Sequence, residues 1–199
     1  MARRVYFAFH YQRDIWRVNV VRNSWVGRDR EACGFYDASL WEKAKTEGKE
    51  ALKRLINKGF ENTSVTAVLI GAETYSREWV LYEIKQSYNR GNGLLGVYIH
   101  NIENSQGLVD YPGKNPFDYV YVDKDGVRTY FSSMYPTYDW VWNDGYNNFG
   151  TWVEEAAQAA AEPRVDLDQQ GTAFSDLVVE AAQPLEADES EDVREQLRE

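Results

Sequence analysis

The chain has 199 residues, 15% of them aromatic, and a formal net charge of −10. This length suits one domain of ordinary size and is short for two. Residues 162–199 hold twelve acidic residues against three arginines, a net charge of −9, which leaves −1 for residues 1–161. Since a nearly neutral body and an acidic tail lack the positive field that holds nucleic acid or an anionic membrane, we expect neither as a partner.

Cysteine usage and the N-terminal segment predict a cytoplasmic protein. The single cysteine, Cys33, rules out an internal disulfide and suits a reducing compartment. The first residues, MARRVYFAFHYQRD, contain only a short apolar run, and no stretch approaches the roughly 20 apolar residues of a transmembrane helix. The two histidines and the cysteine show no ligand spacing, so we expect no metal site.

The first half of the chain alternates short apolar runs with amphipathic stretches, a pattern typical of a parallel sheet covered by helices. Residues 4–9 (RVYFAF) are predicted as strand one, and the stretch after them, with apolar residues at spacings of three and four, as a helix. Residues 34–37 (GFYD) are predicted as a short second strand. A helix is then expected over about 43–57, ending near Gly59.

The clearest predicted strand is residues 65–71 (VTAVLIG), which are uncharged, rich in β-branched residues and closed by glycine. We place this strand in the middle of the sheet. The segment SREWVLYEIKQSYNR follows as a helix, with Ser76 as its N-cap and Gly91 or Gly93 beyond its end. Residues 94–100 (LLGVYIH) are predicted as strand four.

Beyond strand four the sequence predicts a long insertion, a last helix and a tail. Residues 101–136 are rich in Gly, Pro, Asn and Asp, and within them YVYVDKDGVRTYF predicts a β-hairpin that turns at its DG dipeptide. Long irregular insertions over an α/β domain are often functional. A helix is predicted over about 146–161. We therefore divide the chain into a domain, residues 1–161, and an acidic tail, residues 162–199, with a short helix near 173–182.

A ligand crevice is expected outside the carboxyl ends of the strands, near a switch in strand order. Three segments should converge there: HYQRD after strand one, DASLW after strand two, and the start of the helix after strand three. In that helix Ser76, Trp79 and Glu83 lie along one stripe, which starts at the crevice. This position makes Glu83 the candidate catalytic carboxylate, although a glutamate in a helix is most often solvated or paired with a neighbour.

The same residues resemble a known family. The pattern S-x-x-W-x-x-x-E after the third strand, preceded by VYFAFHYQRD at the N-terminus, resembles the TIR domain. More closely, six stretches resemble the TIR-like proteins of the Thoeris antiphage defence system: RRVYFAFHYQRDIWRVNVVRNSWV, FYDASLWEKAK, ALKRLINKGFENTSVTAVLIG, REWVLYEIKQS, NPFDY and YDWVWNDGYNNFGTWV. They span about residues 3–153, so the resemblance covers the body of the chain and not its tail.

The resemblance implies both a fold and an activity. The fold is an α/β, flavodoxin-like TIR-type domain of three layers, with a central parallel sheet and a long insertion after strand four. The activity is that of an enzyme which, on sensing infection, cleaves NAD and closes the product into a cyclic ADP-ribose isomer. This signal would activate a partner effector protein, and a phage component is a candidate trigger. Glu83 would be the catalytic glutamate, and NAD would be a substrate, so that no cofactor is expected.

This chemistry has clear physical requirements. Nicotinamide is positively charged in NAD and leaves as a neutral molecule, so the group that needs stabilisation is the oxocarbenium-like ribose. A carboxylate beside the ribose can accept hydrogen bonds from its hydroxyls and hold negative charge near the developing cation. Cyclisation further requires that a hydroxyl of the same molecule reach the anomeric carbon before water does, which calls for a folded substrate in a dry pocket.

Aromatic and polar residues of the three segments are candidates for contacts with NAD. Four rings at or beside the expected crevice could form its walls, and each could equally belong to the core: Phe9, Tyr11, Trp41 and Trp79. His10 could contact phosphate or ribose, or make a structural hydrogen bond. Asp37 and Ser39 could bind the substrate, or only form the turn after strand two.

Two alternative functions stay open at this stage. The chain contains neither G-x-G-x-x-G nor G-x-x-x-x-G-K-[ST], which argues against a Rossmann dehydrogenase and a P-loop NTPase. A TIR-like interaction module that signals by assembly, without catalysis, remains compatible with the pattern. A plain NAD hydrolase also remains, because it differs from the cyclase only in the acceptor.

Overall fold

The computed structural model describes residues 3–26, 31–33, 38–124, 126–161 and 177–179. Its centre is a five-stranded sheet in the order β2-β1-β3-β4-β7, in which every neighbouring pair is parallel. The strands are β1 (Arg4–Ala8), β2 (Glu31–Cys33), β3 (Val65–Ile70), β4 (Gly93–Tyr98) and β7 (Thr137–Asp139). This is the flavodoxin-like order, in which the direction of winding reverses between β1 and β3.

The sheet is buried on both faces because its central strands are almost entirely apolar. All six residues of β3 are buried. Since side chains alternate along a strand, Val65 and Leu69 pack into one core, whereas Val68 and Ile70 pack into the other. Two hydrophobic cores therefore lie on opposite sides of the same sheet.

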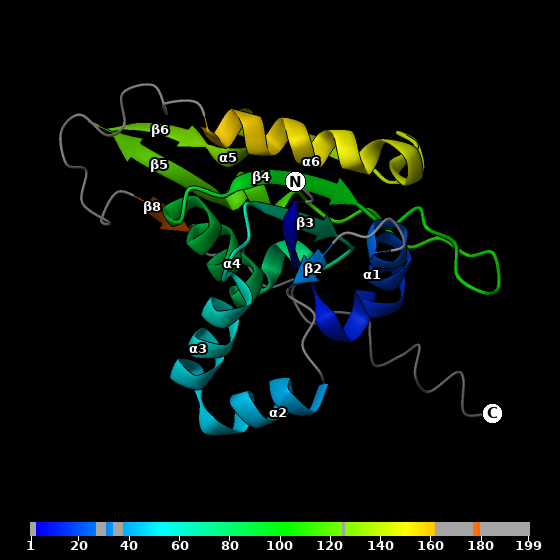
Figure 1. Cartoon of the computed structure of the whole chain (residues 1–199), viewed down its shortest axis with the longest axis horizontal. Helices are drawn as coiled ribbons and strands as arrows, with labels where there is room; N and C mark the ends of the chain where they lie inside the picture. The colour runs from blue at the N-terminus through cyan, green and yellow to red at the C-terminus, as the bar shows by residue number, and fades with distance from the viewer. Residues whose placement is uncertain (1–2, 27–30, 34–37, 125, 162–176, 180–199) are drawn as a thin grey trace.

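Helices cover each face and complete the three layers (Figure 1). One core is closed by α1 (Tyr11–Val26) and α6 (Gly145–Ala161), through residues such as Val18 and Trp152. The other is closed by α3 (Lys49–Gly59) and α4 (Glu78–Asn89), through residues such as Ile56 and Ile84. The preceding helix, α2 (Ala38–Glu47), packs against α3 at the edge of the molecule.

The insertion after β4 adds a second, antiparallel sheet. It contains the 3-10 turn η2 (Pro116–Tyr119), β5 (Val120–Lys124), β6 (Val127–Tyr130) and the short helix α5 (Phe131–Met134). Near the C-terminus, β8 (Leu177–Val179) pairs with the free edge of β5. Buried residues of η2, β5 and α5 extend the core beneath α4. Across the described ranges, no helix combines the length and the apolar character needed to cross a membrane.

Most predicted elements are confirmed. The first and third strands, the central position of β3, the helix after it, strand four, the hairpin and the last helix all occur where the sequence predicts them. The α/β class with a parallel sheet and an insertion after strand four is likewise confirmed. The short fifth parallel strand, β7, has no counterpart among the predicted elements.

Three details of the prediction are wrong. The helix expected over about 43–57 is two helices, because Gly48 between them has a φ of 102°. Helix α4 has Arg77 as its N-cap, since Ser76 belongs to the 3-10 turn η1 (Thr74–Ser76) and its hydroxyl donates to the Glu73 carbonyl oxygen. Leu177–Val179, expected within a short helix, form a strand, because these apolar and β-branched residues pair with an open edge.

The second strand of the sheet, β2, lies just before the residues predicted for it. It pairs in parallel with β1, with Arg4 opposite Glu31 and Tyr6 opposite Cys33. Residues 34–37, where the strand was expected, lie outside the described part of the chain.

Candidate active site

A pocket of about 230 Å³ opens beside the carboxyl end of β1, at the switch point of the sheet. Its lining comes from the end of β1, the start of α1, α2, α3 and the first turns of α4. Six of the nine predicted site residues line it: Phe9, His10, Tyr11, Trp41, Trp79 and Glu83. The topology therefore gathers residues from three separate segments, as expected for a doubly wound fold.

Glu83 lies in the second turn of α4 and is only 6% exposed. Its Oε1 accepts a hydrogen bond of 2.6 Å from the hydroxyl of Tyr6, which reaches across from β1. Burial raises the pKa of Glu83 to about 8, and the hydrogen bond from Tyr6 offsets only part of this rise. At neutral pH the folded protein therefore favours the protonated form of this carboxyl group.

Aromatic rings form much of the pocket wall. The rings of Phe9 and Tyr11 lie 6.0 Å apart on the side of β1. On the opposite side, Trp41 and Trp79 pack with Leu52 in the small core between α2 and α3. The four rings thus both line the pocket and extend the cores, so the two alternatives left open by the sequence are compatible. Such walls exclude water and offer flat surfaces for a base.

Basic and imidazole side chains line the same pocket as the glutamate. His10, Lys45 and Arg77 all line it. Burial, and then the positive charges of Arg77 and Arg13, lower the pKa of His10 to about 4, so its ring is neutral at physiological pH. Arg77 is held by an ion pair with Glu73, four residues earlier. The pocket therefore combines one buried acid with two cationic groups.

An ion-pair network fixes the loops beside the pocket. Arg13 and Arg17 of α1 reach Asp110 in the insertion, with N–O distances of 2.9 and 3.2 Å. Arg13 also contacts Glu73 at 3.2 Å. Between these groups, Asp14 is fully buried and neither carboxylate oxygen has a hydrogen-bond partner among the described residues. Burial raises its pKa to about 6, against the opposing charges of the two arginines.

Close backbone packing holds the insertion over this network. A Cβ atom at Gly113 would lie 2.0 Å from the Gly71 carbonyl oxygen, so only glycine permits the approach. A Cβ atom at Gly71 would in turn lie 2.3 Å from Asp14 Oδ2. Packing and ion pairs therefore seat the insertion firmly against the end of β3.

Three predicted site residues are not placed in the pocket. Ser76 does not line it, because its hydroxyl is turned to the Glu73 carbonyl oxygen at 3.0 Å. Asp37 lies outside the described residues. Ser39 belongs to α2, but its side chain lies outside the described part of the structure.

Sequence reasoning missed several residues at the site. Tyr6 carried one signal, because a tyrosine inside a buried strand needs a partner for its hydroxyl. Lys45 follows Trp41 by four positions, so a correct start for α2 would have placed both on one stripe. Arg77 and Gln12 carried no distinguishing signal.

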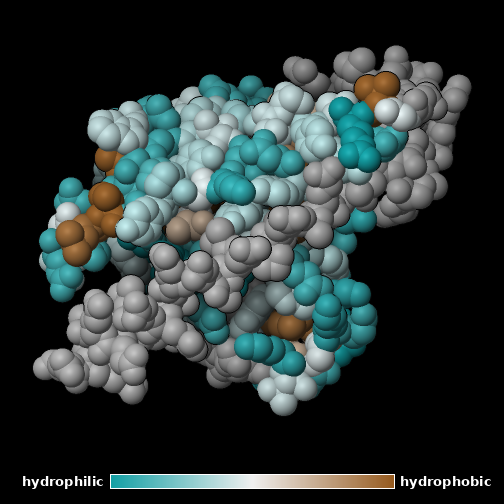
Figure 2. Space-filling view, turned by 180° about the vertical axis from the view of Figure 1, so that it is seen from behind, coloured by the Kyte–Doolittle hydropathy of each residue, from teal (hydrophilic) through white to brown (hydrophobic). Residues whose placement is uncertain are grey.

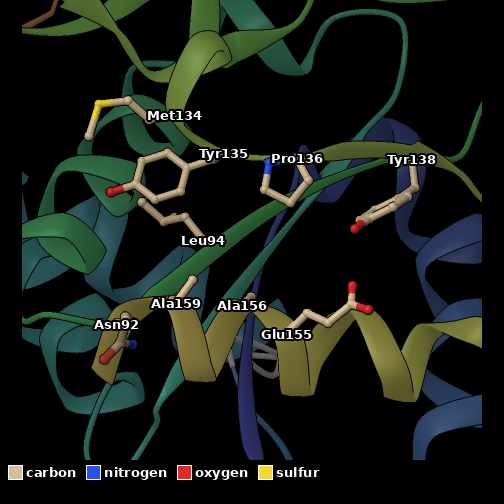
Figure 3. A pocket seen from close by; sticks show the side chains of 11 residues that line it. Asn92, Leu94, Met134, Tyr135, Pro136, Tyr138, Glu155, Ala156 and Ala159 are labelled. Atoms are coloured by element: carbon tan, nitrogen blue, oxygen red, sulfur yellow. The ribbon is translucent and has the colours of Figure 1, made fainter. Parts of the chain in front are cut away.

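A second cavity, of about 450 Å³, lies at the opposite, amino-terminal end of the sheet (Figure 3). Ala156 and Ala159 of α6 face Tyr135 and Pro136 across it. Among its lining residues the single charged group is Glu155, so this larger cavity offers no arrangement of acid and cations comparable to that around Glu83. The smaller pocket is therefore the candidate active site.

Comparisons with known proteins identify the family of the chain. A family model described as "Thoeris protein ThsB, TIR-like domain" matches residues 6–104, a span that contains every residue lining the pocket around Glu83. A relative from Bacillus cereus (strain MSX-D12), named "Putative cyclic ADP-D-ribose synthase ThsB1", is 42% identical over 191 residues. The match covers 77% of this chain and 100% of the relative.

Proposed function

Because the chain belongs to the TIR-like ThsB family of the Thoeris system, we propose that it cleaves NAD and cyclises the product into a cyclic ADP-ribose isomer. The observation that carries this proposal is the buried carboxyl group of Glu83, which lines an aromatic pocket at the switch point of the sheet. The relative's name supports the product class. NAD is the substrate, and no further cofactor is required.

Glu83 stabilises the cationic transition state. The bond between nicotinamide and ribose breaks with its electron pair going to the nicotinamide nitrogen, so positive charge develops at the anomeric carbon. A carboxylate beside that carbon holds the charge in a pocket of low dielectric, where the attraction is strong. The positive nicotinamide ring also favours the ionised form of Glu83 when NAD is bound, which counters the pKa rise caused by burial.

The aromatic walls direct the reaction toward cyclisation. The oxocarbenium ion is captured either by water or by a nucleophilic group of the same ADP-ribose molecule. Walls formed by Phe9, Tyr11, Trp41 and Trp79 reduce access for water and provide a stacking surface that keeps the substrate folded. A folded pose gives the internal nucleophile a high effective concentration, which favours ring closure.

The other polar groups that line the pocket bind the rest of the substrate. Lys45 and Arg77 provide positive charge for the diphosphate. The neutral ring of His10 can exchange hydrogen bonds with ribose hydroxyls without adding a cation next to the developing positive charge. In this assignment the acidic side chain acts on the ribose at the reacting carbon, and the basic side chains bind the diphosphate of the same dinucleotide.

The protein's partners follow from this function. The cyclic nucleotide reaches an effector protein by diffusion through the cytoplasm, and a phage component is the proposed trigger. We assign residues 1–161 to the catalytic domain and the acidic residues 162–199 to a tail, whose described strand, β8, pairs with β5 of the domain. These assignments rest on membership of the family and on the charge distribution.

Nucleotide mass spectrometry tests the function. We expect filtered lysates of cells that express the protein to gain a cyclic ADP-ribose species after phage challenge, and cells that express Glu83→Gln to gain none, a loss of at least about 100-fold, as for a charge-stabilising catalytic group. The matched control is Glu78→Gln. It changes an exposed glutamate five residues earlier on the same helix. This glutamate pairs with Lys49 outside the pocket, so the variant should behave as wild type.

Other outcomes would contradict the cyclase. ADP-ribose without a cyclic species would establish a plain hydrolase with the same glutamate. Full product formation by Glu83→Gln would remove Glu83 from the mechanism. If no new nucleotide appears with several phages, the protein acts as a non-catalytic interaction module.

A further inference from the structure

We propose that Tyr6 is a positioning residue for this reaction: its hydroxyl fixes the carboxyl group of Glu83 at the pocket, where this group stabilises the ribose cation. This inference rests on the proposed function. Tyr6 does not line the pocket, so it acts on the substrate only through Glu83.

The hydroxyl of Tyr6 is held in place from several sides. The residue is fully buried on β1, and its backbone pairs with Cys33 on one side and Thr66 on the other. Its ring stacks on Phe60 with centroids 3.8 Å apart and an interplanar angle of 17°. A side chain packed in this way has little freedom to move its oxygen, so the 2.6 Å hydrogen bond defines where Glu83 Oε1 must lie.

The helix that carries Glu83 is anchored to the same strands. The Ser87 hydroxyl lies 2.8 Å from the Glu83 carbonyl oxygen and 2.7 Å from Thr66 Oγ1 on β3. Both partners of the Tyr6–Glu83 bond are therefore built on rigid elements. Tyr6 engages Oε1 of Glu83, and we assign the other oxygen, Oε2, to hydrogen bonds with the ribose hydroxyls.

A purely structural role explains the pair poorly. Two buried polar side chains that only satisfy each other give no more stability than apolar residues of similar size, and often less. Phe60, Val80 and Ile84 around them show that the surrounding core is apolar. A polar pair at this place is explained by the glutamate's role at the pocket, which a phenylalanine and a leucine could not perform.

Removal of the hydroxyl has a defined electrostatic effect. The bond from Tyr6 stabilises the charged form of Glu83, so its loss raises the pKa of Glu83 further. The other titratable or charged groups that line the pocket with Glu83 come from the start of α1, from α2 and from the start of α4: His10, Tyr11, Lys45 and Arg77. All of these remain in a Tyr6→Phe variant, so any shift in titration reports the missing hydroxyl.

The decisive experiment compares wild type with Tyr6→Phe, which keeps the stacked ring. Carbon-13 NMR of labelled glutamate carboxyl groups follows Glu83, identified by the signal missing from Glu83→Gln. We expect the titration midpoint to rise by about one pH unit, the usual worth of a buried hydrogen bond. With NAD, kcat at pH 7 should fall at least about 10-fold while KM stays within about twofold, and kcat should partly recover at pH 9.

A buried tyrosine elsewhere provides the control. Tyr121 on β5 is 4% exposed and does not line the pocket, so Tyr121→Phe should leave both the Glu83 titration and the kinetics unchanged. Unchanged titration or unchanged kcat in Tyr6→Phe would overturn the positioning role. Full activity of Glu83→Gln would instead overturn the proposed function, so the two failures are distinguishable.

Discussion

At the scale of single residues, the carboxyl group of Glu83 has a cost in stability. Its pKa in the folded protein is about 8, well above the ordinary value of a glutamate, so the folded state binds the proton more tightly than the unfolded chain does. This tighter proton binding stabilises the fold fully below about pH 4.5, and the stabilisation is lost as pH rises through about 8. A binding site, rather than a requirement of folding, explains why such a group is present.

We therefore predict a specific pH dependence of stability. Between pH 5 and pH 9, the free energy of unfolding of wild type should fall relative to Glu83→Gln by up to roughly 4 kcal/mol, because only the glutamate must lose a buried proton. Urea unfolding of both proteins at pH 5, 7 and 9 measures the difference. Glu78→Gln, whose position is exposed, should follow wild type. Parallel curves for Glu83→Gln and wild type would show that Glu83 is not buried as described.

Some site residues could be predicted from the sequence and others could not. Trp79 and Glu83 were predictable because their spacing along one helix, after a recognisable strand, fixes where they lie. Tyr6 and Lys45 were missed, because the weak signals they carry do not tell which element packs against them. Ser76 was misplaced since a 3-10 turn precedes α4, and local propensity does not distinguish that turn from an N-cap.

At the scale of elements, the corner between α2 and α3 shapes one wall of the pocket. Gly48 has φ and ψ of 102° and 179°, a region that is open almost only to glycine. The amphipathic pattern runs through the corner, which is why the sequence predicts one helix there. The bend lets α3 cover the sheet while α2 brings Trp41 and Lys45 to the pocket.

Gly48→Ala should consequently weaken substrate binding more than it slows chemistry. The added Cβ meets no atom within 4 Å, so the cost is backbone strain of about 1–3 kcal/mol, which α2 can relieve by shifting. We expect KM for NAD to rise about fivefold or more with a smaller change in kcat, because Tyr6 and Glu83 lie on β1 and α4. Steady-state kinetics with Glu47→Ala, an exposed neighbour, as control tests this. If KM is unchanged although the variant is less stable, the bend at Gly48 does not contribute to substrate binding.

At the scale of the whole molecule, the parallel sheet was predictable because strands buried on both faces appear as continuous apolar runs. Such runs can be recognised from the local sequence alone. The short strands β7 and β8 were missed, and β2 begins before the residues predicted for it, because local sequence does not determine such short strands. Each has three residues, and its conformation is set by the neighbour with which it pairs.

Figure 2 shows that, on the face seen from behind, hydrophobic residues form small separate patches on a mostly hydrophilic surface.

The pairing of β8 with β5 predicts how the C-terminal segment affects assembly. A chain that ends at Ala161 loses β8 and leaves β5 with an open edge, which favours pairing between molecules. We expect this chain to self-associate in size-exclusion chromatography with light scattering at concentrations where the full chain does not. Turnover of NAD per molecule should persist, because no residue of β5, β6 or β8 lines the pocket.

Charge offers a competing explanation, since the same truncation removes a net charge of −9 and brings the chain close to neutrality. Val178→Pro in the full chain separates the two causes. It keeps the charge and replaces the middle residue of β8, paired with Tyr121, by proline, whose fixed φ and missing N–H disfavour a regular ladder. Association of Val178→Pro would assign the effect to the open edge of β5. If the Val178→Pro chain does not self-associate but the shortened chain does, the effect is due to charge. The pairing of β8 with β5 would then have no consequence for assembly.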